Sequence, residues 1–427
     1  MSLSNYSVHP EAPARPPAAL RLAWLVRHLW PQTLGGVETR VEAVSRHMRL
    51  RGCAVELWTC ALPAGTCRLL GDGRRIRGIG GPTAPGALWR AAPLWRAIHS
   101  AHRLPPQGLA DVVLSPESSL ASAFILTRPE PLLYCPGGVV AECRPWLFPE
   151  APRDGMLAAL RQVSWPVHLH MLAERLCLGR AAGIVAISSI VRDQMVRTCP
   201  PCAPRVRRIS NGYDPADLEQ APDDDGRPFT AICVARLHGI KNLPHLIRAW
   251  TAVRHRPRRL WLVGDGDRRE SLESLVRQLG AADSVQFLGE RRDVPALLGR
   301  SDVFILPSLY EACGSAVIEA MGAALPCLTL RSVPGVSQVG ASDDINVDGL
   351  TGYCVDPADP AELAGRIDDL ARDASARRRM GQAARARVRA EFTWSRAADA
   401  YLAFARDVRA AHTRLSGGRC PRGAACG

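Results

Sequence analysis

Two glutamates, Glu311 and Glu319, lie on either side of the point where an apolar strand pattern gives way to a helical pattern. The run Val303–Leu306 is typical of a buried strand, and a helix is expected to begin at Gly314 or Ser315. Free N–H groups and the positive dipole end of that first turn attract phosphate, and side chains there lean toward the same end. The segment therefore predicts an anion site beside two acceptors, which suits a phosphorylated ligand with free hydroxyls. The alternative is a solvated loop glutamate and one that only complements the helix dipole.

A second candidate pair is cationic. Arg236 stands at the end of the apolar run 229–235, and Lys241 follows five residues later, just before a helical segment. Both side chains are expected in the loops above the strand end, where two cations can hold a diphosphate. The alternative is that they are ordinary surface cations. Lys241 is the only lysine among 54 basic residues, and its neighbours exclude both a P-loop and a protein-kinase lysine motif.

Two glycine-containing loops follow other predicted strands. Gly35 and Gly36 precede the first helical segment and are expected to turn their N–H groups toward a ligand. The stretch 264–267, Gly-Asp-Gly-Asp, lacks the third glycine of a dinucleotide-binding fingerprint and has Arg269 in its place. We interpret its aspartates as parts of a tight strand-to-helix turn, and we expect no metal site.

Alternating strands and helices predict two parallel α/β domains, each built from Rossmann-like units. Open sheets of this kind bind ligands at the carboxyl ends of their strands, so the cleft between the two domains is the predicted ligand site. The expected strands are 22–26, 54–60, 229–235, 260–263, 285–288 and 303–306. The expected apolar stripes are Val37, Val41, Val44 and Met48 on one helix, and Leu272, Leu275, Val276 and Leu279 on another.

Turn-forming and proline-rich stretches suggest where the domains begin and end. A final helix with Trp394, Ala398, Tyr401, Ala405 and Val408 on one face could close over either domain. The expected divisions are a flexible leader at 1–19, an N-terminal domain at 20–210, a linker at 211–228, a C-terminal domain at 229–391, a closing helix at 392–411 and a disordered tail at 412–427.

Composition narrows the class of protein. Hydrophobic residues make up 47% of the chain and charged residues 22%, which excludes a disordered chain. The 14 scattered cysteines, without a secretory signal, favour reduced thiols and a cytoplasmic location. A formal charge of +13 suggests a basic, non-enzymatic nucleic-acid-binding protein as a rival hypothesis. The arginines are spread through predicted helices without a nucleic-acid motif, so we expect no nucleic-acid partner.

Taken in order, these motifs resemble the retaining glycosyltransferases of family 4, whose GT-B fold consists of two facing Rossmann-like domains. The resemblance runs from residue 21 to residue 408. It rests on Gly-Gly-Val-Glu (35–38), Val-Ala-Ile-Ser (185–188), Ile-Ser-Asn-Gly-Tyr-Asp (209–214), Ala-Arg-Leu (235–237) followed by Lys241, Leu-Val-Gly-Asp-Gly (262–266), Phe-Leu-Gly-Glu (287–290), the glutamate pair with Glu-Ala-Met (319–321), and Asp-Gly-Leu-Thr-Gly-Tyr (348–353).

The resemblance implies transfer of a sugar from a nucleotide-sugar donor, UDP-sugar favoured over GDP-sugar, to a hydroxyl of a glycan, glycolipid or small-molecule acceptor. Retention at the anomeric carbon is implied, with no metal and no cofactor beyond the nucleotide-sugar co-substrate. It assigns the diphosphate clamp to Arg236 and Lys241, the donor-sugar contact to Glu311, the ribose hydroxyls to Glu319, and further phosphate contacts to N–H groups near Gly35, Gly36, Gly314 and Ser315. A GT-B nucleotide-sugar epimerase is the nearest alternative.

The sequence departs from the family pattern at two places. The stretch 134–138 has no histidine, whereas many relatives carry one in the comparable loop near the donor sugar. Ala312 and Cys313 replace the commoner Gly-Phe after the first glutamate.

One segment suggests contact with a membrane. In the stretch 85–98, Leu88, Trp95 and Ile98 could share a helix face flanked by arginines, as in a helix that lies on anionic lipid. The alternative is a core helix of the first domain. We hypothesise peripheral attachment to the inner face of a membrane, and no apolar run is long enough to predict a transmembrane helix.

Overall fold

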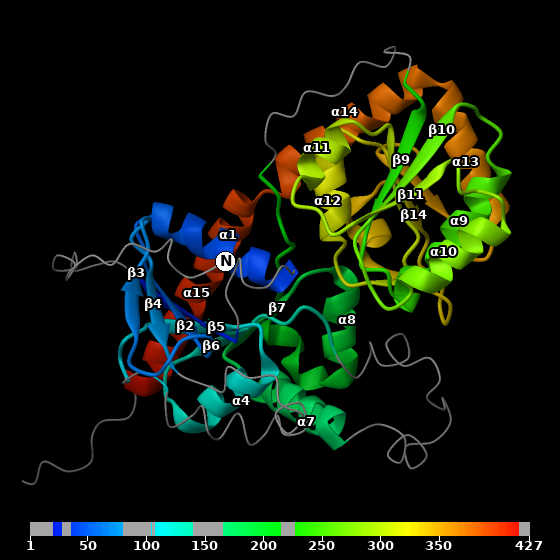
Figure 1. Ribbon diagram of the computed structural model, residues 1–427. Helices are drawn as coiled ribbons and strands as arrows, with labels where there is room; N and C mark the ends of the chain where they lie inside the picture. Colours follow the sequence, from blue (N-terminus) through cyan, green and yellow to red (C-terminus); the bar gives the residue numbers. More distant parts are fainter. Residues whose placement is uncertain are drawn as a thin grey trace, which may run out of the picture. The chain divides into compact units, whose positions relative to one another are not determined.

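The computed structural model describes residues 20–27, 36–79, 104, 107–139, 165–214 and 227–417. The expected leader at 1–19, Gly35, the segment 85–98 and most of the expected linker lie outside these residues. The described chain forms two compact units (Figure 1). The second unit consists of Ser188–Val191 and Ser210–Arg396, and the first unit contains the rest of the described chain, including the residues from Ala397 onward.

The first unit is built on an eight-stranded sheet in the order β3-β4-β2-β1-β5-β6-β7-β8. Only the edge pair β3–β4 is antiparallel among the described strand pairs. The strands are β1 (Arg21–Val26), β2 (Ala54–Thr59), β3 (Cys67–Leu69), β4 (Arg75–Gly78), β5 (Val112–Ser115), β6 (Leu132–Tyr134), β7 (Gly183–Ala186) and β8 (Val206–Arg208). The helices are α1 (Gly36–Leu50), α4 (Ser118–Thr127), α7 (Trp165–Arg180) and α8 (Ser189–Thr198), which begins in the second unit, followed by the 3₁₀ turn Pro200–Arg205.

The second unit has a six-stranded parallel sheet in the order β11-β10-β9-β12-β14-β16. Its strands are β9 (Phe229–Val234), β10 (Arg258–Val263), β11 (Val285–Gly289), β12 (Val303–Leu306), β14 (Cys327–Leu330) and β16 (Gly352–Val355), and a small separate sheet joins β13 (Tyr310–Glu311) to β15 (Gln338–Val339). The strand order reverses between β9 and β12, and this reversal is the topological switch point where doubly wound sheets bind ligands.

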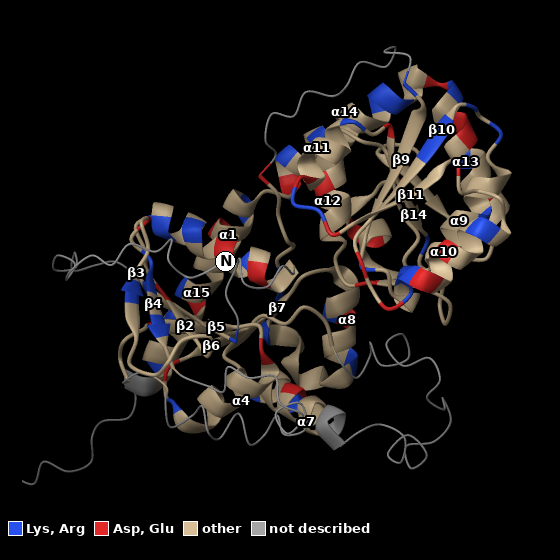
Figure 2. Cartoon of the chain, viewed as in Figure 1, with Lys and Arg blue, Asp and Glu red and all other residues tan. Residues whose placement is uncertain are grey.

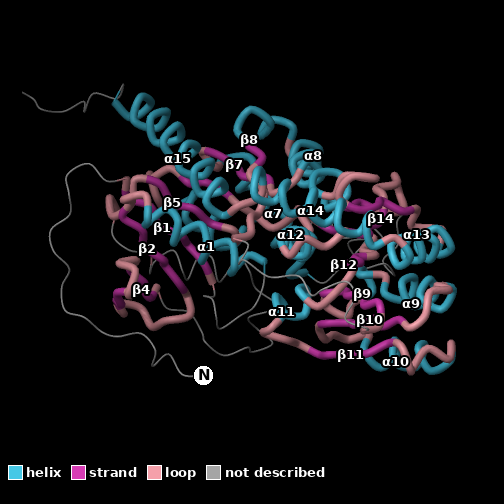
Figure 3. Tube along the Cα trace, turned by 90° about the horizontal axis from the view of Figure 1, so that it is seen from above, coloured by secondary structure: helices cyan, strands magenta, loops and turns pink. Residues whose placement is uncertain are grey.

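Helices cover both faces of the second sheet. Figure 3 shows α9, α10 and α13 on one side of it and α11 and α12 on the other. The helices are α9 (Leu243–Ala252), α10 (Arg269–Gln278), α11 (Val294–Gly299), α12 (Ser315–Gly322), α13 (Pro360–Arg372) and α14 (Ala374–Glu391), with a 3₁₀ turn at Gly239–Lys241 and a π-helical turn at Ala341–Ile345. Because both faces are covered, the central strands are continuous apolar runs, as parallel sheets require.

The predicted strands and helices are largely confirmed. Strand β12 has the predicted bounds, and the predicted face of α1 buries Val41, Val44 and Met48. The apolar stripe on α10 is wrong at its end, because Leu279 is 40% exposed. The helix ends at Gln278, and Gly280 adopts a left-handed conformation with φ of 63°, which is a common way to end a helix.

The last helix, α15 (Trp394–Gly417), extends six residues beyond its predicted end. A disordered tail beginning at 412 is therefore wrong for residues 412–417, because no proline or glycine interrupts the helix before Gly417. The predicted apolar face is buried. From Ala397 onward α15 belongs to the first unit, where the ring of Tyr401 lies 5.8 Å from that of Trp24 in β1. Among the described helices, none is both long and apolar enough to cross a bilayer.

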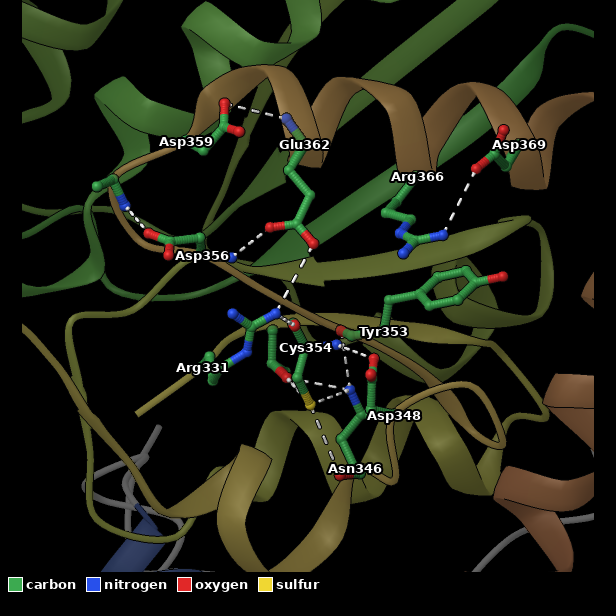
Figure 4. A network of polar contacts seen from close by, with 12 residues as sticks. Arg331, Asn346, Asp348, Tyr353, Cys354, Asp356, Asp359, Glu362, Arg366 and Asp369 are labelled. Atoms are coloured by element: carbon green, nitrogen blue, oxygen red, sulfur yellow. Dashed lines mark hydrogen bonds and ion pairs between the residues drawn. The ribbon is translucent and has the colours of Figure 1, made fainter. Parts of the chain in front are cut away.

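The stretch 348–353, one of the motifs that carry the family resemblance, holds β14 and β16 together. The Asn346 Nδ2 group donates to the carbonyl oxygen of Cys327 in β14 at 3.0 Å, and its Oδ1 atom accepts from the Thr351 hydroxyl at 2.8 Å. The Asp348 Oδ1 atom accepts from the N–H group of Cys354 in β16 at 2.8 Å (Figure 4). This motif is therefore structural, because its polar groups bond to the sheet rather than to a free surface.

We expect Asn346→Leu to lower the free energy of unfolding of the second unit by about 2–4 kcal/mol, since it leaves several buried polar groups without partners. Urea denaturation followed by circular dichroism measures this change. The exposed Asp283→Asn variant is the control and should keep the wild-type midpoint. An unchanged midpoint for Asn346→Leu would show that these hydrogen bonds do not stabilise the sheet.

Candidate functional site

The candidate residues of the second unit meet at the switch point of its sheet. Arg236 and Lys241 follow β9, and Glu311 follows β12, the strand that lies next to β9 in the sheet. The two loops are joined directly, because the N–H group of Leu309 donates to the carbonyl oxygen of Ile240 at 3.0 Å. Strand order thus brings together two sequence motifs that lie about seventy residues apart.

The strongest contact in the site is an ion pair. The Lys241 Nζ atom lies 2.5 Å from the Oε2 atom of Glu311. The hydroxyl of Ser308 donates to the same oxygen at 3.3 Å. The side chains are only 20% and 17% exposed, so each charge is largely withdrawn from water and is neutralised by the other. The sequence predicted separate roles for the lysine and the glutamate, and only the structure shows that they pair.

Arg236 is exposed, and the backbone of its loop is held by hydrogen bonds to the loop after β10. The N–H group of Leu237 donates to the carbonyl oxygen of Asp265 at 2.9 Å, and the N–H group of Arg268 donates to that of Leu237 at 3.0 Å. A Cβ atom on Gly264 would lie 2.1 Å from the carbonyl oxygen of Ala235. The glycine loop after β10 therefore positions the arginine loop by close backbone contact.

Asp265 of this glycine loop serves the turn, as the sequence predicted. The Asp265 carboxylate accepts from the N–H group of Gly266 at 2.7 Å and pairs with Arg269 at 3.2 Å. The described residues contain no group of three or more His, Cys, Asp or Glu side chains arranged to hold a metal ion. Asp265 therefore has a structural explanation in the turn itself, while the role of Asp267 stays a prediction.

The N-terminus of α12 has no side-chain cap. Gly314 is the N-cap residue, and its φ of 86° lies in the left-handed region that favours glycine. A Cβ atom there would lie 2.5 Å from that of Ala341, the first residue of the π-helical turn. The Ser315 hydroxyl oxygen accepts a hydrogen bond from the Asn211 side chain at 2.9 Å. The N–H group of Val317 donates to the carbonyl oxygen of Gly314 at 2.9 Å, so the N–H groups of Ser315 and Ala316 are the donors left, with the helix dipole, to attract an anion.

Glu319 lies in the second turn of α12, and burial raises the pKa of its carboxyl to about 7. No hydrogen bond or ion pair holds this carboxylate among the described residues. Burial also raises the pKa of the Tyr213 hydroxyl, and the negative charge of Glu319 adds to this shift, so the two side chains are neighbours. A half-buried carboxylate without a donor is costly to ionise, and it gains most from a ligand that brings hydroxyl groups.

In the first unit, the sequence singled out the glycines Gly35 and Gly36 and the stretch 134–138. Gly36 is the exposed first residue of α1, while Gly35 lies outside the described residues, so their role stays a prediction. The stretch 134–138 has no reactive group in place of the missing histidine, because burial raises the pKa of Cys135 to about 12. Its carbonyl oxygen accepts a hydrogen bond at 2.6 Å from the buried Arg40 of α1.

Sequence reasoning missed two residues of the site. Asn211 was noted only as part of the motif 209–214, and Ser308 was not singled out at all. Asn211 contacts the start of α12, and Ser308 contacts Glu311. The periodicity of the sequence does not predict that Asn211 lies near α12 or that Ser308 lies near Glu311. The family motif that contains Asn211 could be recognised from the sequence.

The fold and this site define a class of doubly wound α/β protein that binds its ligand where the strand order reverses. A family model described as Glycosyl transferases group 1 matches residues 216–387, and a model described as Glycosyltransferase Family 4 matches residues 34–217. The two matches together cover most of the chain. The chain belongs to the glycosyltransferases of family 4, which confirms the resemblance seen in the sequence.

Individual relatives share part of this similarity. The chain is 28% identical over 251 residues to an alpha-D-kanosaminyltransferase of Streptomyces kanamyceticus, an alignment that covers 55% of this chain and 63% of that relative. A glycogen synthase of Mycobacterium tuberculosis is 29% identical over 244 residues, covering 54% of this chain and 56% of the synthase. The chain thus spans less than two thirds of the length of these curated relatives.

Solved structures show the same fold. A sucrose-phosphate synthase from Thermosynechococcus elongatus superposes with a TM-score of 0.75 at 18% identity, covering 92% of this chain and all of that one. Anabaena HepE in complex with UDP and glucose gives a TM-score of 0.66 at 19% identity, covering 90% and 98% of the two chains. The predicted GT-B fold class, with two Rossmann-like domains, is confirmed.

Glu319 makes the stability of the unliganded protein depend on pH. Its pKa is 4.5 as an isolated group and about 7 when folded, so the stabilising contribution of the neutral form is complete below pH 4.5 and is lost as pH rises through 7. We expect Glu319→Gln to raise the free energy of unfolding by about 3 kcal/mol at pH 8 and to change it little at pH 4.5. Urea titrations at both pH values measure this difference.

The exposed Glu270→Gln variant on α10 is the control and should show no such pH-dependent gain. If Glu319→Gln were no more stable than the wild type at pH 8, the carboxylate would have a compensating partner in the folded protein.

Proposed function

We propose that this protein transfers a sugar from a nucleotide-sugar donor to an acceptor hydroxyl, with retention at the anomeric carbon. The observation that carries the proposal is a lysine–glutamate ion pair, an uncapped helix N-terminus and a half-buried carboxylate on the loops and helix at one switch point. Each part suits a different portion of a nucleoside diphosphate sugar: the diphosphate, the sugar and the ribose. Membership of family 4 supports the same reading.

Positive groups hold the diphosphate in this proposal. Arg236 and Lys241 extend from the loop after β9, and the first turn of α12 offers free N–H groups near Gly314 and Ser315. Negative charge grows on the departing diphosphate as the bond to the sugar breaks. Fixed cations and helix dipoles stabilise that charge without reorganising during the reaction. They also supply the positive charge that a divalent metal would otherwise bring, so the proposed reaction uses none.

Glu311 exchanges partners when the donor binds. Before binding, its carboxylate is neutralised by Lys241 at 2.5 Å. A diphosphate draws the ammonium group toward its own oxygens, because charge-assisted hydrogen bonds to phosphate are strong. The carboxylate is then free to accept hydrogen bonds from sugar hydroxyls, while the Ser308 hydroxyl keeps its orientation. The ion pair therefore keeps the empty site electrically neutral and prepares it for both ends of the donor.

Glu319 accepts the ribose hydroxyls. Its carboxylate is half-buried and has no donor among the described residues, and a ribose diol supplies two. UDP-sugar is the favoured donor, and this choice is supported by HepE, a protein of the same fold solved with UDP and glucose. GDP-sugar is the second choice. The acceptor is a hydroxyl of a glycan, a glycolipid or a small molecule.

The first unit provides the acceptor site in this proposal, and Gly35 and Gly36 add phosphate contacts. We further propose a cytoplasmic protein that attaches peripherally to anionic membrane through the segment 85–98, which lies outside the described residues. Basic and acidic residues are interspersed over the helices of both units rather than gathered on one (Figure 2), which does not favour a nucleic-acid-binding protein.

The test combines binding with turnover. We expect UDP to raise the melting temperature more than GDP or ADP, and Arg236→Ala or Lys241→Ala to lower kcat on the order of 100-fold or more, because each removes a charge contact made in the transition state. Release of nucleoside diphosphate from UDP-glucose in the presence of candidate acceptors measures turnover.

Arg277→Ala, on the exposed face of α10, is the matched arginine control and should keep the wild-type rate. Wild-type rates in both cation variants would refute the diphosphate clamp. A nucleotide-sugar epimerase would interconvert the donor without releasing diphosphate, so release that depends on acceptor distinguishes a transferase from it.

The affinity of the protein for UDP should depend on pH through Glu319. A pKa of about 7 leaves the carboxyl mostly protonated at pH 6 and mostly ionised at pH 8, and the ionised form is the better acceptor for ribose hydroxyls. We expect the Kd for UDP to be about tenfold higher at pH 6 than at pH 8. Calorimetric titration measures it.

Glu319→Gln is the control for this pH effect, since titration of the phosphates is common to both proteins. The variant should bind more weakly at pH 8 and lose the part of the pH dependence that comes from the carboxyl. The same pH dependence in both proteins would remove Glu319 from the ribose site.

A further inference from the structure

Asn211 is a buried residue with an unexplained carbonyl group. Its side chain is 5% exposed, and its Nδ2 group donates to the Ser315 hydroxyl oxygen at 2.9 Å. Its Oδ1 atom is buried and has no hydrogen-bond partner among the described residues. Leaving a carbonyl oxygen unsatisfied in a protein interior costs about 1–3 kcal/mol. A buried polar atom without a hydrogen-bond partner is rare in folded proteins, so its presence here needs an explanation.

The backbone around Asn211 is fixed independently of that side chain. A Cβ atom on Gly212 would lie 2.4 Å from the backbone of Thr393, and the N–H group of Tyr213 donates to the carbonyl oxygen of Phe392 at 2.8 Å. On the other side, the Ser210 hydroxyl lies 3.7 Å from the Sγ atom of Cys313. The segment 210–213 is therefore held against the loop that leads into α12, and the Asn211 amide has little freedom to turn elsewhere.

The direction of the hydrogen bond has a chemical consequence. A serine hydroxyl has one hydrogen to donate and lone pairs that accept. Because Asn211 donates to the Ser315 oxygen, the hydroxyl hydrogen of Ser315 is not used by Asn211 and is free to point away from it. It lies at an uncapped helix N-terminus, beside N–H groups that also have no intrahelical acceptor.

We propose that Asn211 is a positioning residue that acts through Ser315: it occupies the acceptor side of the Ser315 hydroxyl so that the hydroxyl donates to the diphosphate bound at α12. This inference rests on the proposed function. It assigns a task to the motif 209–214, which lies about a hundred residues from Ser315 in the chain. Holding the amide in the orientation that donates to Ser315 leaves its Oδ1 atom without a hydrogen-bond partner, and this lowers the stability of the protein.

The test compares a ligand with phosphate to one without. Calorimetry gives the Kd for UDP and for uridine with the wild type, Asn211→Ala, Asn211→Asp, Ser315→Ala and the Asn211→Ala/Ser315→Ala double variant. We expect Ser315→Ala and Asn211→Ala each to raise the Kd for UDP about tenfold, as for loss of one hydrogen bond to a charged group. The Kd for uridine should change less than about twofold.

Two results distinguish action through Ser315 from a merely structural role. The double variant should bind UDP about tenfold more weakly than the wild type, not about a hundredfold, because both single changes remove the same hydrogen bond. Asn211→Asp should raise the Kd for UDP by about thirtyfold or more, since a carboxylate accepts the Ser315 hydrogen and repels phosphate. Ser271→Ala, at an exposed serine of α10, is the matched control and should keep the wild-type Kd for both ligands.

Three outcomes would overturn the inference. Equal weakening of UDP and uridine would show that Asn211 only maintains the fold. Additive effects in the double variant would show that Asn211 and Ser315 act separately. A wild-type Kd for Asn211→Asp would show that the side chain accepts from Ser315 rather than donating to it. If the wild-type protein binds none of UDP, GDP and ADP, the proposed function fails, and this inference fails with it.

Discussion

The ion pair between Lys241 and Glu311 is the interaction on which the rest of the site depends. Two half-buried charges at the end of a parallel sheet are tolerable only when they neutralise each other, because an unpaired charge in such a place is strongly destabilising. The pair stands where the strand order reverses, between the loops after β9 and β12. A phosphorylated ligand can replace each partner's contact with one of its own, so the pair is stable in the empty site and can be exchanged when the ligand binds.

Close backbone contacts hold the loops that carry these charges. Gly264 and Gly314 sit where a Cβ atom would collide with a neighbouring loop, and a Cβ atom on Gly266 would lie 2.4 Å from the carbonyl oxygen of Leu237. Hydrogen bonds between the loops after β9 and β10 fix the arginine loop further. The glycines thus serve as contact points between loops, and this gives the Gly-Asp-Gly turn after β10 a structural role beside the candidate site.

In the proposed function, the second unit gives up some stability to keep polar groups ready for a ligand. Glu319 is a carboxylate whose burial raises its pKa to about 7, and Asn211 keeps a buried carbonyl oxygen without a partner. Elsewhere in the same unit, buried polar groups such as Asn346 have their hydrogen bonds satisfied. Asn346 thus helps to build the sheet, whereas Glu319 and Asn211 are groups to which we assign a ligand role.

The sequence by itself determined most helices and strands, and it identified the acidic and basic side chains that are candidates for the site. Continuous apolar runs predicted strands such as β12, and helical spacing predicted the buried face of α1, because burial of nearby side chains imposes these short periods. Only the tertiary structure decided which of the candidates meet. The Lys241–Glu311 and Asn211–Ser315 contacts join residues 70 and 104 positions apart, and no local period encodes such a distance. Likewise, the sequence showed the apolar face of α15, but the packing of Tyr401 on Trp24 determined that the helix joins the first unit.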